Sequence, residues 1–488
     1  MDADVIIIGA GFAGLGLAIA LSETNTSFVV IEKAADVGGT WRDNTYPGCA
    51  CDIPSTLYSY SFEPNAAWTR VFPRQQELLA YLQGCADKYD VRKHIRFNTE
   101  LREARYDETD STWHVTLGDG ATLVSRLLVS AMGPLSKPNL PNLPGRELFT
   151  GAAFHSAQWD SSVELRGKRV AVIGTGASAI QIVPEIAPDV AHLTLFQRTP
   201  PWIVPRHDVA IDDRQKRLRK SVPGYGWFIR KLLYWILEIR AFGFTVKPAV
   251  LLKQEQLALA SMRRRITDPV LRAKVTPNYR MGCKRVLISD DYYQTLTRDN
   301  VTLVTTAVSA FSERGLIASD GTEYPIDVAI FGTGFRATDG MLPVKIYGRS
   351  GVELNAAWQA GMEAYLGTTV AGFPNFFTII GPNTGLGHNS MVLMMEAQYR
   401  YILDALRTMK RKRLRAFDVR VAVQRAFNER IQKRMKQTVW ASGCASWYID
   451  ARGKNTTLWP GFTFVYRYLT RHFRTSDYEL TPEGRRTA

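Results

Sequence analysis

Three glycines near the N-terminus, Gly9, Gly11 and Gly14, have the G-x-G-x-x-G spacing of a loop that holds a dinucleotide pyrophosphate. An apolar run at residues 4–8 precedes them, a helical pattern follows, and the next apolar run ends at Glu32. The glycines allow a tight turn and a close backbone approach, the helix N-terminus receives the pyrophosphate, and the acid accepts hydrogen bonds from ribose hydroxyls. The pattern therefore predicts a dinucleotide site, to which we also assign Phe12, Ala13 and Lys33.

The pattern recurs in the middle of the chain, but with a neutral residue at the acidic position. An apolar run at residues 169–173 leads into Gly174 and Gly176. Glu32 lies 23 residues after Gly9, and the residue 23 positions after Gly174 is Gln197. An acid would repel a 2′-phosphate, whereas a neutral residue followed by a cation suits one. We therefore predict an FAD site at the N-terminus and an NADP(H) site here, with further contacts from Thr175, Ser178, Ala179, Arg198 and Thr199.

Composition places the chain among ordinary globular proteins. At roughly 150 residues per domain, a chain of 488 residues is expected to form about three domains. Hydrophobic residues make up 45% of the chain and charged residues 22%, which excludes disordered and fibrous classes. Lys and Arg outnumber Asp and Glu by 61 to 46, which gives a net charge of +15. Because no nucleic-acid-binding motif accompanies this charge, we expect no nucleic-acid partner and assign part of the excess to binding of a phosphorylated dinucleotide.

The cysteines and histidines predict neither a disulfide scaffold nor a metal site. The five cysteines are scattered, and no C-x-x-C pair, H-E-x-x-H motif or His/Cys cluster is present. This cysteine usage fits a reducing cytoplasm. We expect a strand at the start of the sequence, with no cleavable signal before it.

A long apolar stretch at residues 225–244 raises the question of a membrane. Four charged residues interrupt it, so it lacks the roughly 18 uninterrupted apolar residues of a membrane span. We expect a packed helix whose Arg and Lys side chains reach to solvent. A helix on a membrane surface, or a lid over the substrate path, remains open as an alternative.

These elements predict an α/β fold with two Rossmann-like dinucleotide-binding domains and a helical insertion. We expect the FAD-binding domain at residues 1–141 and 337–488, the NADP-binding domain at 142–207 and 277–336, and the insertion at 208–276. The strand at 328–331 suits the return of the chain to the first domain. A strand-to-turn unit at 372–383 ends at Asn383, where backbone could approach a flat ligand, and the last ~15 residues are expected to be loose.

Two further motifs make the chain resemble a known family. Residues 149–160 match the fingerprint F-x-G-x-x-x-H-x-x-x-W-(P/D), with His155 and Trp159 at its defined positions. Residues 38–52 match (A/G)-G-x-W-x-x-x-x-(F/Y)-P-(G/M)-x-x-x-D, from Gly39 and Trp41 to Asp52. In these motifs and their order the chain resembles the type I Baeyer–Villiger monooxygenases.

The resemblance implies a flavoprotein that uses FAD, NADPH and dioxygen to convert a ketone to an ester or lactone through a C4a-peroxyflavin. That chemistry needs a fixed cation near the flavin. The resemblance assigns this role to Arg285, positioned by Asp52, and a second 2′-phosphate contact to Lys284. It places His155 and Trp159 at the domain linker and Trp447 and Tyr448 on a mobile C-terminal element that contacts substrate. Its remaining flavin-side residues are Gly39, Thr40, Trp41, Tyr46 and Ile53.

Three other functions share this nucleotide architecture. A flavin monooxygenase that oxygenates sulfur or nitrogen typically lacks the Trp-Asp end of the fingerprint, seen here at Trp159-Asp160. A disulfide reductase needs a close cysteine pair beside the flavin, which the sequence does not suggest. An uncoupled NADPH-oxidising flavoprotein is the remaining alternative.

Overall fold

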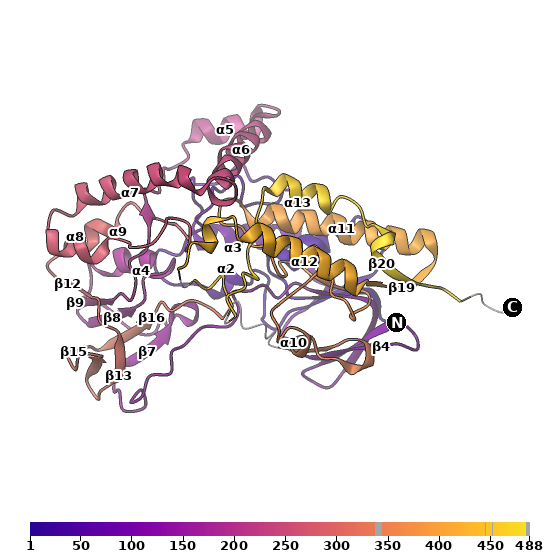
Figure 1. Cartoon of the computed structure of the whole chain (residues 1–488), viewed down its shortest axis with the longest axis horizontal. Coiled ribbons are helices and arrows are strands. Elements are labelled where there is room, and N and C mark those ends of the chain that lie inside the picture. The colour runs from indigo at the N-terminus through magenta and orange to yellow at the C-terminus, as the bar shows by residue number, and fades with distance from the viewer. Residues whose placement is uncertain (337–343, 445, 451, 485–488) are drawn as a thin grey trace.

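The computed structural model describes residues 1–336, 344–444, 446–450 and 452–484. Two lobes, each built around a largely parallel sheet, lie side by side, and a helical projection rises above them (Figure 1). The predicted α/β fold with two Rossmann-like units is therefore confirmed.

The first lobe holds an eight-stranded sheet, to which the N-terminal strand and two strands after residue 344 belong. Strand β1 (Ala3–Ile8) is apolar from Val5 to Ile8 because it lies in the middle of the sheet and both its faces are covered. It pairs in parallel with β2 (Phe28–Ile31) and β6 (Thr122–Ser130). The other strands are β3 (Ile95–Arg96), β4 (Leu101–Asp107), β5 (Thr112–Leu117), β17 (Lys345–Tyr347) and β18 (Phe376–Thr378), which joins β6.

Helix α1 (Phe12–Ser22) connects β1 to β2 and is apolar on all sides. Such a helix must be buried all round, and α1 is enclosed by the sheet, by α3 (Gln75–Lys88) and by α11 (Met391–Lys412). Gly16 permits this packing, since a Cβ there would lie 2.5 Å from the Tyr399 hydroxyl. The loop between β1 and α1 is thereby fixed in position.

The second lobe holds a five-stranded parallel sheet in the order β12-β9-β8-β16-β7. Strands β8 (Arg169–Ile173) and β9 (His192–Phe196) flank α4 (Ala179–Ile186). Strand β16 (Val328–Phe331) lies between β8 and β7 (Ala152–His155), so it belongs to this sheet and the chain returns to the first lobe only after it. The edge strands are β7 and β12 (Val301–Val304).

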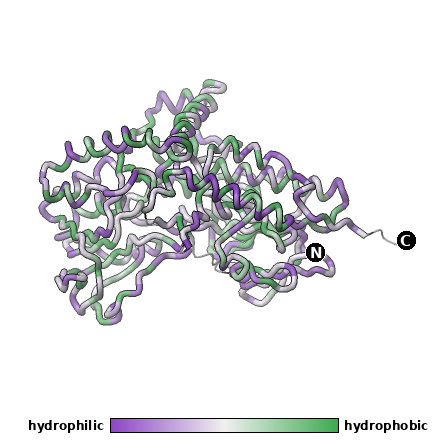
Figure 2. Tube along the Cα trace, in the orientation of Figure 1, coloured by the Kyte–Doolittle hydropathy of each residue, from purple (hydrophilic) through white to green (hydrophobic). Residues whose placement is uncertain are grey.

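The predicted insertion forms helices α5 (Asp213–Ser221), α6 (Tyr225–Thr245), α7 (Leu251–Arg265) and α8 (Pro269–Val275). Helices α5 and α6 form the projection in Figure 1. Figure 2 shows that hydrophilic and hydrophobic stretches alternate on this projection as they do elsewhere on the trace. No helix within the described ranges is both long and apolar enough to cross a membrane.

The C-terminal region is more ordered than expected. This region contains α12 (Val421–Met435) and α13 (Thr463–Leu469), of which α13 packs with α11. Strand β20 (Tyr478–Pro482) pairs antiparallel with β19 (Leu414–Val419). The expected loose tail of ~15 residues is therefore wrong for residues 478–482, because the buried Tyr478 ring anchors the strand. Residues 485–488 lie outside the described part of the chain.

Candidate functional site

The loop after β1 has the geometry that close approach to a ligand requires. Gly9 has a φ of 100°, and a Cβ on Gly14 would lie 1.8 Å from the Gly9 carbonyl oxygen. A Cβ on Gly11 would lie 3.6 Å from the Gly39 Cα, so the two glycine motifs of this lobe face each other. A side chain at Gly14 would open the turn, which explains why the G-x-G-x-x-G spacing is needed.

Glu32 is fixed at the carboxyl end of β2, beside this loop. Its carboxylate is buried and accepts hydrogen bonds from the backbone N–H groups of Ala10 (2.8 Å) and Ala34 (3.0 Å). Arg42 also donates to it, at 3.2 Å. The acid is therefore held within the loop's own hydrogen-bond network. Of the other predicted contacts, Lys33 and Thr40 are exposed, whereas Phe12 and Ala13 are buried.

Aromatic side chains form a wall next to the same loop. The Phe12 and Trp41 rings lie 5.0 and 5.5 Å from the Tyr58 ring, and Trp41 Nε1 donates to the Tyr58 hydroxyl at 3.3 Å. Burial raises the pKa of Tyr58, so its hydroxyl stays protonated. Flat apolar walls of this kind suit a planar ring system. Tyr58 was not among the predicted site residues, and its sequence context gave no signal for it.

The loop after β8 repeats the first geometry in the second lobe. Gly174 has a φ of 106°, and a Cβ there would lie 2.6 Å from the Gly332 carbonyl oxygen. Thr175 Oγ1 donates to the Thr199 carbonyl at 3.2 Å, which ties this loop to the end of β9. Ser178 precedes α4, whose first residue is Ala179. The helix therefore begins at the loop, as anion binding at its N-terminus requires.

Two cations from distant segments meet beside this second loop. Arg198 follows β9 and is exposed, and Lys284 comes from the loop before β11 (Leu287–Ile288). Burial and the positive charge of Arg198 lower the pKa of Lys284. The Lys284 ammonium also lies 4.9 Å from the centre of the Tyr279 ring. Two like charges held together favour the binding of an anion.

Arg285 and Asp52 form an ion pair between the two lobes. Arg285 Nε donates to Asp52 Oδ2 at 2.9 Å, and its Nη2 donates to the same oxygen. The Asp52 carboxylate raises the pKa of Arg285, so the guanidinium is permanently charged. Tyr448 lies close enough to interact with the guanidinium electrostatically: burial raises the pKa of Tyr448 to about 12, although the positive charge of Arg285 opposes that shift. The predicted residues Asp52, Arg285 and Tyr448 are thus brought together.

The loop that contains Asp52 is joined to α4 of the other lobe. Gln181 Nε2 donates to the Ala50 carbonyl at 3.0 Å, and the Tyr46 hydroxyl donates to Gln181 Oε1 at 3.1 Å. Gly48 has a φ of 77°, and a Cβ there would lie 2.7 Å from the Gln181 carbonyl oxygen. The motif glycine therefore permits the lobes to touch. Gln181 was not predicted, because nothing in a helical sequence indicates that one amide will bind across a domain boundary.

His155 lies where the chain crosses between the lobes. It ends β7, is fully buried, and accepts a hydrogen bond at Nδ1 from the Ala157 N–H at 3.0 Å. Its ring centre lies 5.7 Å from that of Phe335, on the segment that leaves β16. Burial lowers the pKa of His155, so the imidazole is neutral at pH 7. Trp159 packs edge-on against Phe154 at 5.2 Å, and Ile53 is only partly buried.

The turn at Asn383 supports the C-terminal segment. Asn383 has a φ of 56°, and its Nδ2 donates to the carbonyls of Asn455 and Leu458, both at 2.9 Å. Both hydrogen bonds that the Asn383 Nδ2 group donates therefore go to the backbone of this segment. Further along, Trp447 is exposed and its ring centre lies 4.5 Å from that of the buried Tyr448.

Cys283 and Cys444 form a disulfide across 161 residues of sequence. The scattered spacing of the cysteines did not predict this single bond, which forms because folding brings the loop before Lys284 against the segment before Trp447. The bond joins the segments that carry Arg285 and Tyr448, whereas Cys49, Cys51 and Cys85 are free and buried. The expected cytoplasmic location stays a prediction.

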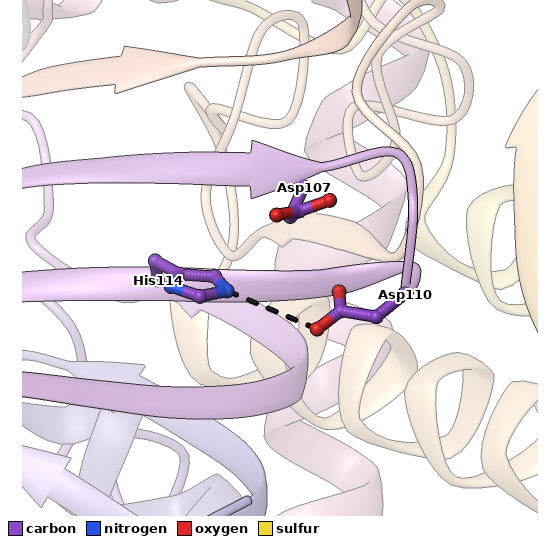
Figure 3. Close-up of side chains that lie close together, drawn as sticks. All are labelled: Asp107, Asp110 and His114. Carbon is purple, nitrogen blue, oxygen red and sulfur yellow. Dashed lines mark ion pairs between the residues drawn. The ribbon is translucent and has the colours of Figure 1, made fainter.

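Asp107, Asp110 and His114 lie close together on the turn between β4 and β5 (Figure 3). Asp107 accepts a hydrogen bond from the Thr109 N–H at 2.7 Å, and Asp110 accepts one from the Thr112 N–H at 3.0 Å. These are the local bonds of Asx turns. The carboxylates are therefore explained by the turn, and the cluster lies on a strand connection that carries none of the predicted site residues.

Comparisons with known proteins agree with this geometry. Residues 2–343 match the flavin-binding monooxygenase-like family. A Baeyer–Villiger monooxygenase of Pseudomonas aeruginosa is 50% identical over 480 residues, covering 98% of this chain and 91% of the relative. A Baeyer–Villiger monooxygenase of Streptomyces coelicolor is 49% identical over 479 residues, covering 98% of this chain and 92% of the relative.

Solved structures show the same architecture along the whole chain. An oxidized steroid monooxygenase bound to NADP superposes with a TM-score of 0.88 at 30% identity, covering 99% of this chain and 100% of that one. A closed structure of cyclohexanone monooxygenase superposes with a TM-score of 0.89 at 28% identity, covering 99% of each chain. The chain therefore belongs to the flavin-binding monooxygenase-like family and, within it, to the type I Baeyer–Villiger monooxygenases.

Proposed function

We propose that this protein is an FAD- and NADPH-dependent Baeyer–Villiger monooxygenase that inserts one oxygen atom of dioxygen next to the carbonyl of a ketone substrate. The observation that carries the proposal is the ion pair between Asp52 and Arg285, which holds a permanent cation where a loop of the first lobe meets the segment that follows the insertion. Membership in the family, and a relative structure described as a complex with FAD and NADP, support the same reaction.

The first lobe fits FAD. A Cβ at Gly14 would fill the turn after β1, and Glu32 lies at the ribose position of the motif. We assign the flavin to residues 1–141 and 337–488, with Trp41 and Tyr46 on its wall and Asn383 holding the segment beside it. The second lobe, residues 142–207 and 277–336, fits NADPH, with Gly174, Gly176, Ser178 and Thr199 at the pyrophosphate and Arg198 and Lys284 at the 2′-phosphate.

Three residues of this chain, Arg285, Asp52 and Tyr448, act together with the bound cofactors. Bound FAD, once reduced by NADPH, supplies the activation of dioxygen. Arg285 stabilises negative charge that develops on oxygen while the ketone carbonyl is attacked, because a fixed cation in a partly buried site needs no reorganisation. Asp52 is a positioning residue, since it holds the guanidinium through two hydrogen bonds to one carboxylate oxygen. Tyr448 keeps its proton at neutral pH and so adds no opposing charge.

His155 and Trp159 would couple the lobes. His155 is neutral and buried beside Phe335, at the crossing between the two sheets. This position suits transmission of domain movement and leaves no route for proton exchange with a substrate. Trp447 is exposed next to Tyr448, which suits a contact that forms when the substrate is bound.

The test is NADPH consumption by the FAD-loaded protein in air, with linear, cyclic and aryl ketones and one thioether. Product mass and hydrogen peroxide are followed in parallel. Ketone-dependent oxidation that yields a product heavier by one oxygen atom is the expected result. Oxygenation of the thioether alone would instead assign an electrophilic flavin monooxygenase, and NADPH loss matched entirely by hydrogen peroxide would assign an uncoupled flavoprotein.

A further inference from the structure

Helix α6 is anchored by one face only. Glu238 is buried and accepts hydrogen bonds from Thr463 Oγ1 and Asn389 Nδ2, both at 2.8 Å. The Tyr234 hydroxyl also bonds to Thr463 at 3.0 Å, and Arg230 Nη2 donates to the Ser59 carbonyl at 3.1 Å. These contacts fix the rotation of the helix, so the opposite face is held in solvent.

That opposite face is strongly apolar. Residues spaced three and four apart share one side of a helix, and the exposed side of α6 carries Phe228, Leu232, Trp235, Ile236, Ile239 and Phe242. Trp227 is exposed at the N-terminal end of the helix, in line with Tyr234. Trp227 is 64% and Ile239 68% exposed. The face continues onto α13, where the Phe464 ring lies 6.2 Å from Trp235 and Tyr468 is exposed. Hereafter these residues of α6 and α13 are called the apolar face. Contiguous exposed apolar surface of this extent marks an interaction site.

The surroundings of the apolar face are basic. Residues 212–253, all of them described, contain ten Lys or Arg residues and three acids, which are the exposed Asp212 and Asp213 and the buried Glu238. Five of the basic residues, from Arg214 to Lys220, lie on α5. The Lys231 ammonium lies 5.6 Å from the centre of the Trp227 ring, at the edge of the apolar face. Tryptophan flanked by lysine and arginine is the composition of helices that lie in the interface of an anionic membrane.

We propose that the projection formed by α5 and α6 docks onto the surface of an anionic lipid bilayer. The apolar face would enter the boundary between headgroups and acyl chains, and the basic residues of α5 would bind lipid phosphates. A second copy of the chain is a poorer occupant, because a symmetric contact through this face would place two basic α5 helices against each other.

A cavity of about 220 Å³ lies behind this projection. Ile229 and Leu233 of α6 line it together with Pro54, which follows Asp52 by two residues. Docking would therefore bring the membrane close to the loop that positions Arg285. The docking proposal itself is independent of the proposed reaction.

The test is sedimentation of the FAD-loaded protein with vesicles of phosphatidylcholine, alone or mixed with phosphatidylglycerol. We expect binding to the anionic vesicles that weakens as salt is raised. Arg217→Glu with Lys220→Glu should lower vesicle affinity by roughly tenfold or more, and Ile239→Asp should also abolish most binding. The matched controls are Arg430→Glu with Lys433→Glu, and Val421→Asp, which reverse exposed charges and alter an exposed aliphatic residue (61%) on α12.

These controls should bind as the parent protein does. NADPH oxidation without vesicles and flavin content should be equal in all variants, which shows that each is folded. Absence of binding at low salt, or equal losses in the controls, would overturn the proposal. A dimer in solution that Ile239→Asp dissociates would assign the apolar face to a second copy instead.

Discussion

Asp52 and Arg285 are separated by 233 residues and meet in an ion pair with an Nε–Oδ2 distance of 2.9 Å. Both guanidinium nitrogens that take part bind the same carboxylate oxygen. The pair joins a loop of the first lobe to a loop that follows the insertion. Its geometry fixes where a positive charge lies between the lobes, and this is the basis of the first prediction.

Arg285→Ala should lower ketone oxygenation by at least ~100-fold, because the fixed cation is lost. Reduction of the flavin by NADPH, followed by stopped-flow absorbance, should persist. Asp52→Asn should have a smaller effect on turnover, since it loosens the guanidinium without removing it. Arg280→Ala is the control. Arg280 is in the same segment as Arg285, but it is ion-paired with Glu255 of α7, at 3.3 Å. Retained ester formation by Arg285→Ala would remove Arg285 from the mechanism.

Arg198 and Lys284 should distinguish NADPH from NADH. Removal of a charged hydrogen-bond partner costs about 1.5–3 kcal/mol, so Arg198→Ala or Lys284→Ala should raise the KM for NADPH by roughly 10-fold to 100-fold. The KM for NADH should be unchanged, as it has no 2′-phosphate. The exposed Lys253 of α7 provides the control, Lys253→Ala. An equal loss with both nucleotides would place these cations elsewhere than at the 2′-phosphate.

The lowered pKa of Lys284 predicts a pH dependence. Burial and Arg198 favour the neutral amine, so Lys284 loses its proton at lower pH than an ordinary lysine. The kcat/KM for NADPH should therefore fall as pH rises through this pKa. Lys284→Arg should flatten the fall, because a guanidinium stays charged. A profile that is the same for both proteins would contradict the assignment.

Gly48→Ala should destabilise the contact between the lobes. The new Cβ would lie 2.7 Å from the Gln181 carbonyl oxygen, in addition to the cost of a φ of 77°. Gly133→Ala is matched, since Gly133 has a φ of 68° but open space around its Cβ position. Thermal unfolding should show an extra loss of about 1–3 kcal/mol for Gly48→Ala, and more hydrogen peroxide per NADPH is expected. Equal losses would show that the contact does not matter.

The disulfide predicts a thiol count. In denatured but unreduced protein, a thiol reagent should modify three cysteines, Cys49, Cys51 and Cys85. After reduction it should modify all five. Cys444→Ser should raise the unreduced count to four, because Cys283 is released. Reduction should lower the free energy of unfolding by about 2–4 kcal/mol, and it should leave the stability of Cys444→Ser unchanged. Five reactive thiols in the untreated protein would contradict the pairing.

The sequence alone indicated both Rossmann-like units, since each is a local feature: an apolar strand, a glycine loop and a helix occupy about 30 consecutive residues. The neutral Gln197 with Arg198 likewise pointed to NADP by its offset from Gly174. Arg285, Asp52 and Tyr448 followed only from resemblance to a family, because nothing local in their segments indicates that they meet.

Tertiary structure decided the relations that depend on which surfaces touch. Gln181 binds Tyr46 and Ala50, and Cys283 pairs with Cys444, because folding brings separate segments together. Helix α6 has apolar residues on all sides, so the pattern could not say which side packs. Glu238 settles this by its buried hydrogen bonds to Thr463 and Asn389, which turn the side with Trp235 and Ile239 toward solvent. Local sequence determines an element; which of its faces is covered depends on the partner that the rest of the chain provides.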